Sequence, residues 1–204
     1  MHKQGSPRPI RIVKLGGSLL NTPDLRSRFD RWCAANPHPC TLVLVGGGSL
    51  VDAVRQLDAV HQFSATFSHW LCISLLEQTA RLAHQLLPNR LLIETREDLD
   101  FFLSSRCATD RRSQQSVAIV QVGLFIHPTQ GEIQLPESWD ITSDSIAAAC
   151  CQRMNAEKLV LLKSVTVTRP MDRLDELAQQ GIVDPYFPDL AKSLHQVEIV
   201  NLRE

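Results

Sequence analysis

Two lysines in apolar surroundings are the residues of this chain whose type and position could do chemistry. Lys14 lies in the segment IRIVKLGG and Lys163 in KLVLLKSV, whereas most basic residues of the chain are arginines. Because burial of an unpaired ammonium group is costly, each lysine is expected to meet an anion. A compact, mobile positive charge is what a transferring phosphoryl group requires. The alternative is a lysine at a strand end that extends its ammonium group to water.

Glycine-rich segments directly follow two apolar runs, at Lys14–Ser18 (KLGGS) and Val45–Ser49 (VGGGS). At the carboxyl end of a parallel strand, unobstructed backbone N–H groups and the N-terminus of the following helix can hold an anion, which favours a phosphate site. The signature G-x-x-x-x-G-K-[ST] is absent, and Val51 replaces the last glycine that a dinucleotide-binding motif needs. Taken singly, each segment is also compatible with a plain tight turn.

An aspartate, Asp144, lies in the first turn of a predicted helix, within the segment WDITSDS. An acidic residue at this position commonly stabilises the helix dipole. It could also act as an acceptor that orients both Lys14 and Lys163. The choice depends on whether Asp144 lies near Lys14 in space.

Strands and helices alternate along the chain and would position these residues. The apolar runs predict strands, and the spacing of apolar residues predicts helices. Strands are expected at Ile10–Leu15, Thr41–Val45, Leu91–Glu94, Leu159–Leu162 and Val197–Leu202, with a further apolar stretch at Ser116–Phe125. Helices are expected around Asp24–Ala35, Leu50–Val60, Ser68–Leu87, Thr142–Asn155 and Asp172–Gln180, and an exposed loop at Ser104–Ser116. This order predicts an α/β protein, a three-layer αβα sandwich with a mostly parallel central sheet.

The composition excludes several classes of protein. With 204 residues, 44% of them hydrophobic and 21% charged, the chain is expected to form one globular domain. A formal net charge of -1 removes the overall attraction that drives nonspecific binding to nucleic acids or anionic membranes. No apolar stretch is long enough to span a bilayer, and the polar N-terminus does not resemble a secretory signal, so a cytoplasmic location is expected.

The six cysteines show no C-x-x-C pair and no zinc-like spacing with histidine. No metal-ligating residues are therefore predicted. We interpret the cysteines as free thiols, mostly small core residues. The adjacent pair Cys150-Cys151 leaves a redox switch open as an alternative.

Four segments of the chain together resemble the amino acid kinase family. They are VKLGGS at Val13–Ser18, LVGGGSLVDAVR at Leu44–Arg55, TSDSIAA at Thr142–Ala148 and LVLLKSV at Leu159–Val165. Members of this family transfer the γ-phosphoryl group of ATP, with Mg²⁺, to a carboxylate, a phosphate or a related oxyanion. The resemblance implies a kinase of a small molecule that forms a homodimer or larger homo-oligomer. It also implies a single domain with an acceptor-binding lobe at about residues 1–115 and a shortened nucleotide-binding lobe at about 116–204.

The resemblance also implies roles for individual residues. Lys14, Asp144 and Lys163 would be catalytic, with Asp144 holding the two lysines. The nucleotide phosphates would be bound by Lys163 together with four further residues, Gly16, Gly17, Ser18 and Ser164. The phosphoryl acceptor would be bound by Gly46, Gly47, Gly48, His69, Trp70, Asp140 and Thr142.

Within the family, two segments resemble a small archaeal-type branch, Ser68–Trp70 and Leu135–Ser145. That branch phosphorylates aminomethylfuran-methyl phosphate in methanofuran synthesis. A His-Trp pair on a helix is also typical of core packing. After Lys163, the aspartate-glycine pair that is usual in the family is replaced by Ser164–Pro170. Two alternatives to a kinase therefore stay open, a noncatalytic anion- or nucleotide-binding protein and an assembly subunit whose glycine segments are only turns.

Overall fold

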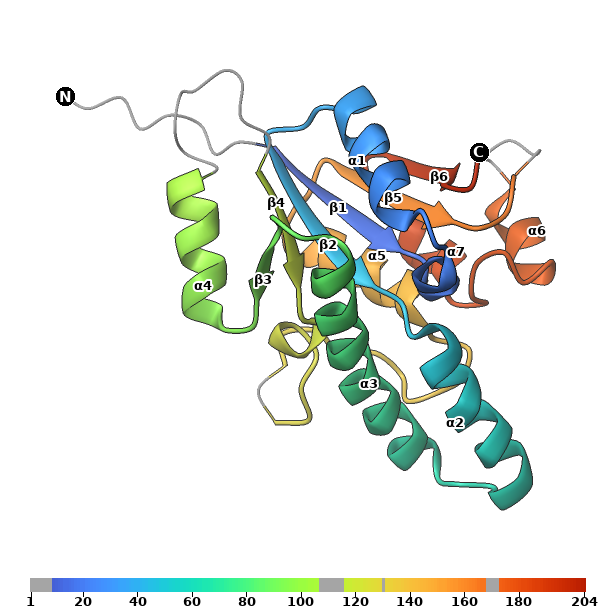
Figure 1. The fold of residues 1–204 in the computed structure, drawn as a ribbon. Helices are drawn as coiled ribbons and strands as arrows, with labels where there is room; N and C mark the ends of the chain where they lie inside the picture. Colours follow the sequence, from blue (N-terminus) through green and yellow to red (C-terminus); the bar gives the residue numbers. More distant parts are fainter. Residues whose placement is uncertain (1–8, 107–115, 130, 168–172) are drawn as a thin grey trace.

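The computed structural model describes residues 9–106, 116–129, 131–167 and 173–204, and in it the chain forms one six-stranded parallel sheet flanked by helices (Figure 1). The strands are β1 (Ile10–Leu15), β2 (Cys40–Val45), β3 (Leu91–Ile93), β4 (Ser116–Val120), β5 (Lys158–Lys163) and β6 (Val197–Asn201). Their order is β3-β4-β2-β1-β5-β6, and every neighbouring pair is parallel. The predicted α/β fold is confirmed.

Helices connect these strands and cover the sheet. They are α1 (Leu25–Ala35), α2 (Gly48–His61), α3 (Ala65–Leu86), α4 (Arg96–Phe101), α5 (Ser143–Arg153), α6 (Leu174–Gln179) and α7 (Phe187–Ala191). Short 3-10 segments follow β1 and β4 at Gly17–Asn21 and Val122–Leu124, and a π-helical turn, Phe102–Arg106, extends α4. Helix α2 leads away from the sheet and α3 returns to it, so the pair extends beyond the strand ends (Figure 1).

Alternate residues of the central strands face two separate apolar clusters, as the period of two in a strand requires. Val13, Val43 and Val160 pack with α1, whereas Ile12, Leu42 and Leu159 pack with α5 on the opposite face. Both faces of β2 are buried along its whole length, which explains its continuous apolar sequence. The two clusters hold β1, β2 and β5 in a fixed register.

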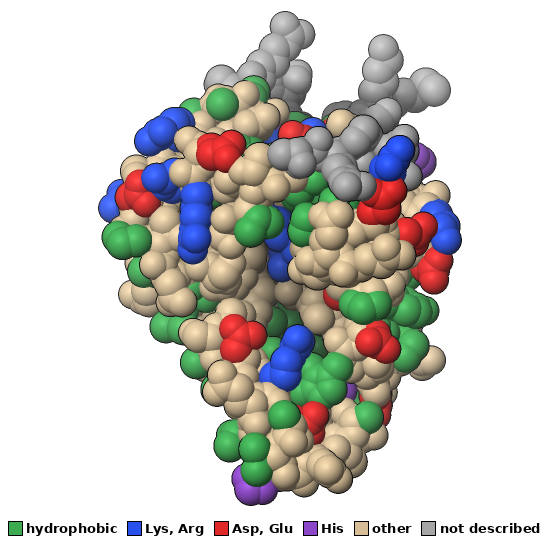
Figure 2. All heavy atoms as spheres, turned by 90° about the vertical axis from the view of Figure 1, so that its right-hand side faces the viewer, with side chains coloured by type: hydrophobic (Ala, Val, Ile, Leu, Met, Phe, Trp, Pro, Cys, Tyr) green, Lys and Arg blue, Asp and Glu red, His purple; other side chains and the backbone are tan. Residues whose placement is uncertain are grey.

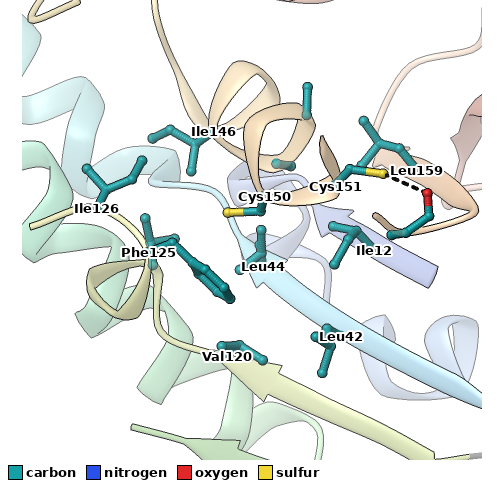
Figure 3. Packing of buried hydrophobic residues seen from close by; sticks show 14 of the residues in the cluster. Ile12, Leu42, Leu44, Val120, Phe125, Ile126, Ile146, Cys150, Cys151 and Leu159 are labelled. Carbon is teal, nitrogen blue, oxygen red and sulfur yellow. Dashed lines mark hydrogen bonds between the residues drawn. The ribbon is translucent and has the colours of Figure 1, made fainter. Parts of the chain in front are cut away.

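The adjacent thiols of α5 belong to the second of these clusters. Cys150 faces Leu44 and Phe125, whereas the Cys151 sulfur lies 3.7 Å from the carbonyl oxygen of Ala156 (Figure 3). Burial raises the pKa of both thiols, that of Cys151 to about 12. Because a buried thiol with a raised pKa is unreactive, this environment favours packing over a redox switch.

The prediction of free thiols holds for four cysteines, Cys33, Cys72, Cys150 and Cys151. It is wrong for Cys40, which is disulfide-bonded at the start of β2. The absence of a C-x-x-C pair excludes only bridges between residues close in sequence, so the spacing gave no signal for a more distant one. Cys107 and most of the predicted loop Ser104–Ser116 lie outside the described residues.

Among the described residues, no helix combines the length and the apolar character that a membrane span needs. Several large apolar side chains of the α2–α3 pair are nevertheless exposed. Those with more than a third of their surface exposed are Leu50, Leu57, Val60, Phe67, Leu82 and Leu86. Of the apolar residues that predicted α2, only Val54 is buried. The helical spacing was therefore predictive of the helix but not of a buried face.

Candidate functional site

Lys14, Asp144 and Lys163 meet at the carboxyl edge of the sheet. Lys14 precedes the last residue of β1, Lys163 ends β5, and these strands are hydrogen-bonded neighbours. Asp144, in the first turn of α5, lies between them. Its Oδ1 is 2.8 Å from Lys14 Nζ, and its Oδ2 is 2.5 Å from Lys163 Nζ. One carboxylate therefore bridges two ammonium groups that lie 149 positions apart in the numbering (163 − 14).

All three side chains are almost fully buried, with exposed fractions of 7%, 4% and 12% for Lys14, Asp144 and Lys163. Burial alone would raise the pKa of Asp144, but the two neighbouring ammonium groups hold it below its ordinary value. Burial and, after it, the positive charge of Lys14 lower the pKa of Lys163 to about 8, although Asp144 acts in the opposite direction. The cluster carries two positive charges against one negative charge, so it attracts a further anion.

The two glycine-rich segments lie against each other beside this cluster. Gly46 N–H donates to Leu15 O at 2.9 Å, and Gly16 N–H donates to Leu162 O at 2.8 Å, which ties the ends of three strands together. A Cβ atom on residue 17 would lie 2.1 Å from Gly48 N, so no larger residue fits there. Gly48 has a φ of 53°, in the left-handed region that favours glycine. This close approach of two turns requires glycine at both positions.

A cavity of about 210 Å³ opens between these turns, the α2–α3 pair and the start of α5. Figure 2 shows the corresponding face of the molecule hollowed at its centre, with Lys or Arg side chains in and beside the hollow. Six of the predicted site residues line the cavity, namely Lys14, Gly17, Gly47, Gly48, His69 and Thr142. The sequence-based prediction thus locates one end of this cavity.

Three of the predicted acceptor-binding residues, Gly46, Trp70 and Asp140, do not line this cavity. Trp70 packs against the core, and its Nε1–H donates to Glu137 at 2.9 Å, so the packing alternative describes it better. Asp140 is exposed and accepts a hydrogen bond from Ser138 Oγ at 3.2 Å. His69, the neighbour of Trp70, does line the cavity, and burial lowers the pKa of its imidazole, which favours the neutral form.

The four sites predicted to bind nucleotide phosphates besides Lys163 lie around the last residues of β1 and β5. Ser18 Oγ and Ser164 Oγ are 3.0 Å apart, which places the turns after the two strands in contact. Neither serine lines the 210 Å³ cavity. Of the three charged residues of the cluster, only Lys14 lines the cavity.

The described residues contain no group of three His, Cys, Asp or Glu side chains that could hold a metal ion. Both carboxylate oxygens of Asp144 face ammonium groups. Because Mg²⁺ is usually bound through one or two carboxylates together with substrate phosphates, a carboxylate at this position fits an ion that enters with a nucleotide.

The sequence interpretation missed Asp184, a buried aspartate between α6 and α7. Its Oδ2 accepts hydrogen bonds from Thr142 N, Thr142 Oγ1 and Ser145 N at 2.8–3.0 Å. Its Oδ1 accepts from Ser145 Oγ and from Phe187 N. Asp184 therefore fixes the first turn of α5, which carries Asp144. Nothing in the local sequence of Asp184 distinguishes it from a surface aspartate.

The sequence interpretation also missed a contact between an arginine and a tryptophan in the lining of the cavity. The Arg55 guanidinium lies 4.9 Å from the centre of the Trp139 ring, and both residues line the cavity. Trp139 Nε1–H donates to Asp58 Oδ2 at 2.6 Å. Arg55 is the last residue of the motif LVGGGSLVDAVR, and this position was the only signal in the sequence that could have pointed to it.

Solved structures with the same fold span nearly the whole chain. The UMP kinase of Bacillus anthracis has a TM-score of 0.63 at 12% identity, covering 98% of this chain and 89% of its own. The uridylate kinase of Archaeoglobus fulgidus has a TM-score of 0.55 at 15% identity, covering 95% and 92%. The aspartate kinase of Synechocystis has a TM-score of 0.62 at 15% identity, covering 95% of this chain and 38% of its own.

At such identities the similarity to these structures shows the fold. No curated protein sequence matches the chain significantly. The sequence profile of the amino acid kinase family, however, matches residues 9–168, which include β1, β2, α5 and β5 with the cluster of Lys14, Asp144 and Lys163. This chain belongs to the amino acid kinase family.

Proposed function

We propose that the protein is an ATP-dependent kinase that transfers the γ-phosphoryl group to a phosphate or carboxylate of a small molecule. The observation that carries the proposal is the bridge formed by Asp144 between Lys14 and Lys163 beside the cavity. Two ammonium groups held by one carboxylate leave a net positive charge where a transferring phosphoryl group would need it. The family and its kinase-like members support this reaction class.

In this mechanism an acceptor oxyanion in the cavity attacks the γ-phosphorus in line. A P–O bond to the acceptor forms while the bond to the bridging oxygen breaks, and ADP leaves with the electron pair. A phosphate or carboxylate acceptor is already ionised, so no general base is needed. Lys14 and Lys163 neutralise charge on the transferring oxygens, and the backbone N–H groups of the glycine turns position them. Mg²⁺, bound to the nucleotide phosphates, would supply further charge neutralisation.

The test is transfer of label from γ-labelled ATP to a panel of phosphomonoesters and carboxylates. Lys14→Ala is expected to lower transfer at least about a hundredfold, because it removes a charge that acts on the transition state. Lys158→Ala is the matched control, since Lys158 begins β5 and pairs with Glu198 at the surface. Absence of transfer to every acceptor, together with absence of ATP binding, would overturn the proposal.

The alternative is a noncatalytic protein that binds an anion or a nucleotide on the same scaffold. It is favoured by the segment after Lys163, where the sequence Ser164–Pro170 replaces the aspartate-glycine pair that is usual in the family. Calorimetric titration that detects ATP or phosphate-ester binding, without any transfer of label, would support this alternative. Measured turnover would exclude it.

The acceptor and the assembly state belong to the same proposal. Aminomethylfuran-methyl phosphate is included in the panel because the segments Ser68–Trp70 and Leu135–Ser145 resemble the methanofuran branch. The exposed apolar side chains of α2 and α3 support a homodimer or larger oligomer. Light scattering coupled to size exclusion measures that mass directly. A cytoplasmic location stays a prediction.

A further inference from the structure

The cavity has a second basic group, Arg55, far along α2 from the glycine turns. Its guanidinium has no carboxylate within 4.0 Å among the described residues. It contacts the Trp139 ring instead, at 4.9 Å from the ring centre, which is within the range of a cation–π interaction. All five of its N–H donors are therefore available to a ligand.

Trp139 holds Arg55 in place because Trp139 is itself anchored. Its Nε1–H donates to Asp58 Oδ2 at 2.6 Å. Asp58 Oδ1 also accepts from Phe63 N at 2.9 Å and from Ser68 Oγ at 3.3 Å, across the turn between α2 and α3. The carboxylate of Asp58 thus binds the turn and the indole, and it forms no ion pair with Arg55.

The position of Arg55 on α2 separates it from the proposed site of phosphoryl transfer beside Lys14. Arg55 follows Gly48 by seven residues on α2, which corresponds to about 10 Å along the helix axis. The Trp139 ring, which Arg55 contacts, is held by Asp58 in the last half of α2. The cavity wall includes apolar side chains, among them Val51, Ile73 and Ile141, together with polar residues such as Asp52 and His69.

We propose that the phosphoryl acceptor carries a second anionic group, roughly 10 Å from the oxyanion that is phosphorylated, and that Arg55 binds this group. The acceptor is then a small molecule with an anion at each end and an apolar middle. This inference rests on the proposed kinase function, since the first anion is the one placed beside Lys14. It assigns Arg55 as the residue that determines specificity for the second anion, with Trp139 and Asp58 as positioning residues.

Two synthetic probes of matched length test the proposal by calorimetric titration. The first is 6-(phosphonooxy)hexanoate, whose phosphate and carboxylate are roughly 9 Å apart when extended, at about 1.2 Å per bond as in an extended chain. The second is hexyl phosphate, which lacks the carboxylate. We expect the first probe to bind about tenfold more tightly or better, since Arg forms bidentate, charge-assisted hydrogen bonds to a carboxylate.

Arg55→Gln is expected to remove this preference while retaining the affinity for hexyl phosphate. Arg26→Gln is the matched control, because Arg26 is an exposed arginine on α1 that lies 3.8 Å from Asp30. Trp139→Phe keeps an aromatic face but loses the bond to Asp58, and it is expected to reduce the preference partly. Since Arg55 is exposed, loss of folding is not expected to obscure the comparison.

Three results would overturn the proposal. They are equal binding of the two probes by the unaltered protein, a preference that persists in Arg55→Gln, and an equal loss of affinity for both probes in that variant. The third result would place Arg55 at the transferred group. Label transfer from ATP to each probe is measured in parallel. A preference that depends on Arg55, without any transfer, would support the assignment of Arg55 to the second anion, whereas the kinase function is decided by the panel of acceptors and by ATP binding.

Discussion

At the scale of single residues, the charge state of Lys163 sets an upper pH limit for the proposed reaction. Its pKa is lowered to about 8, first by burial and then by the charge of Lys14. Above this pH the side chain loses the charge that would face the transferring phosphoryl group. We therefore expect kcat/KM for ATP to fall as pH rises through about 8, because this ratio reports the free enzyme.

Lys163→Arg tests the origin of this pH limit, since a guanidinium stays protonated throughout the range. The decline near pH 8 should disappear, even if the maximal rate is lower. An unchanged decline in Lys163→Arg would assign the limit to another group.

The lowered pKa of Lys163 also makes the stability of the protein depend on pH. Between the folded pKa of about 8 and the ordinary value of 10.5, the unfolded chain binds more protons, so stability should rise with pH in this window.

Asp144 is expected to contribute to stability as well as to the site. Asp144→Asn would leave two buried ammonium groups without their shared anion, a change that typically costs about 3–5 kcal/mol. Urea denaturation at pH 7 measures the loss. The loss should shrink at pH 10, where Lys163 can release its proton because its pKa is lowered to about 8. Asp189→Asn, which removes an exposed partner of Lys192, is the control and should change stability little. An Asp144→Asn loss as small as the control's would contradict the buried bridge.

At the scale of elements, Asp184 links the segment between α6 and α7 to the start of α5. Asp184→Asn would turn an N–H donor toward backbone and hydroxyl donors, so the first turn of α5 should loosen. Because this turn carries Asp144, we expect kcat to fall about tenfold or more, with little change in the dissociation constant for ATP. Asp175→Asn, an exposed aspartate of α6, is the control. Equal effects on kcat and ATP binding would contradict a positioning role.

The elements that carry the site were predictable because each has a strong local signal. Mostly apolar runs identify β1, β2 and β5, since strands buried on both faces need few polar positions. Glycine turns mark the strand ends. The contact between Asp144 and the two lysines could only be hypothesised, because it depends on the tertiary structure. Helix α7 and Asp184 gave no signal, since a helix of five residues shows no periodicity.

At the scale of the whole molecule, the order of the strands could not be read from the sequence. The sequence suggested an acceptor lobe ending near residue 115 and a nucleotide lobe after it. In the structure β4, from the second segment, lies between β2 and β3 of the first and pairs with both. Sequence patterns report local conformation, whereas this insertion depends on pairing across long distances along the chain. The two-lobe division stays a prediction about function, on a sheet that is continuous.

This strand order predicts that the two segments do not fold independently. A fragment of residues 1–115 lacks the strand between β2 and β3, and it also lacks α5, which covers one face of the central strands. We expect neither this fragment nor residues 116–204 to show a cooperative urea transition by circular dichroism. The full chain should unfold in one transition that coincides in circular dichroism and tryptophan fluorescence. A cooperative transition in either fragment alone, or separate transitions in the full chain, would show that each half has a core of its own. The site would then form between two units instead of within a single sheet.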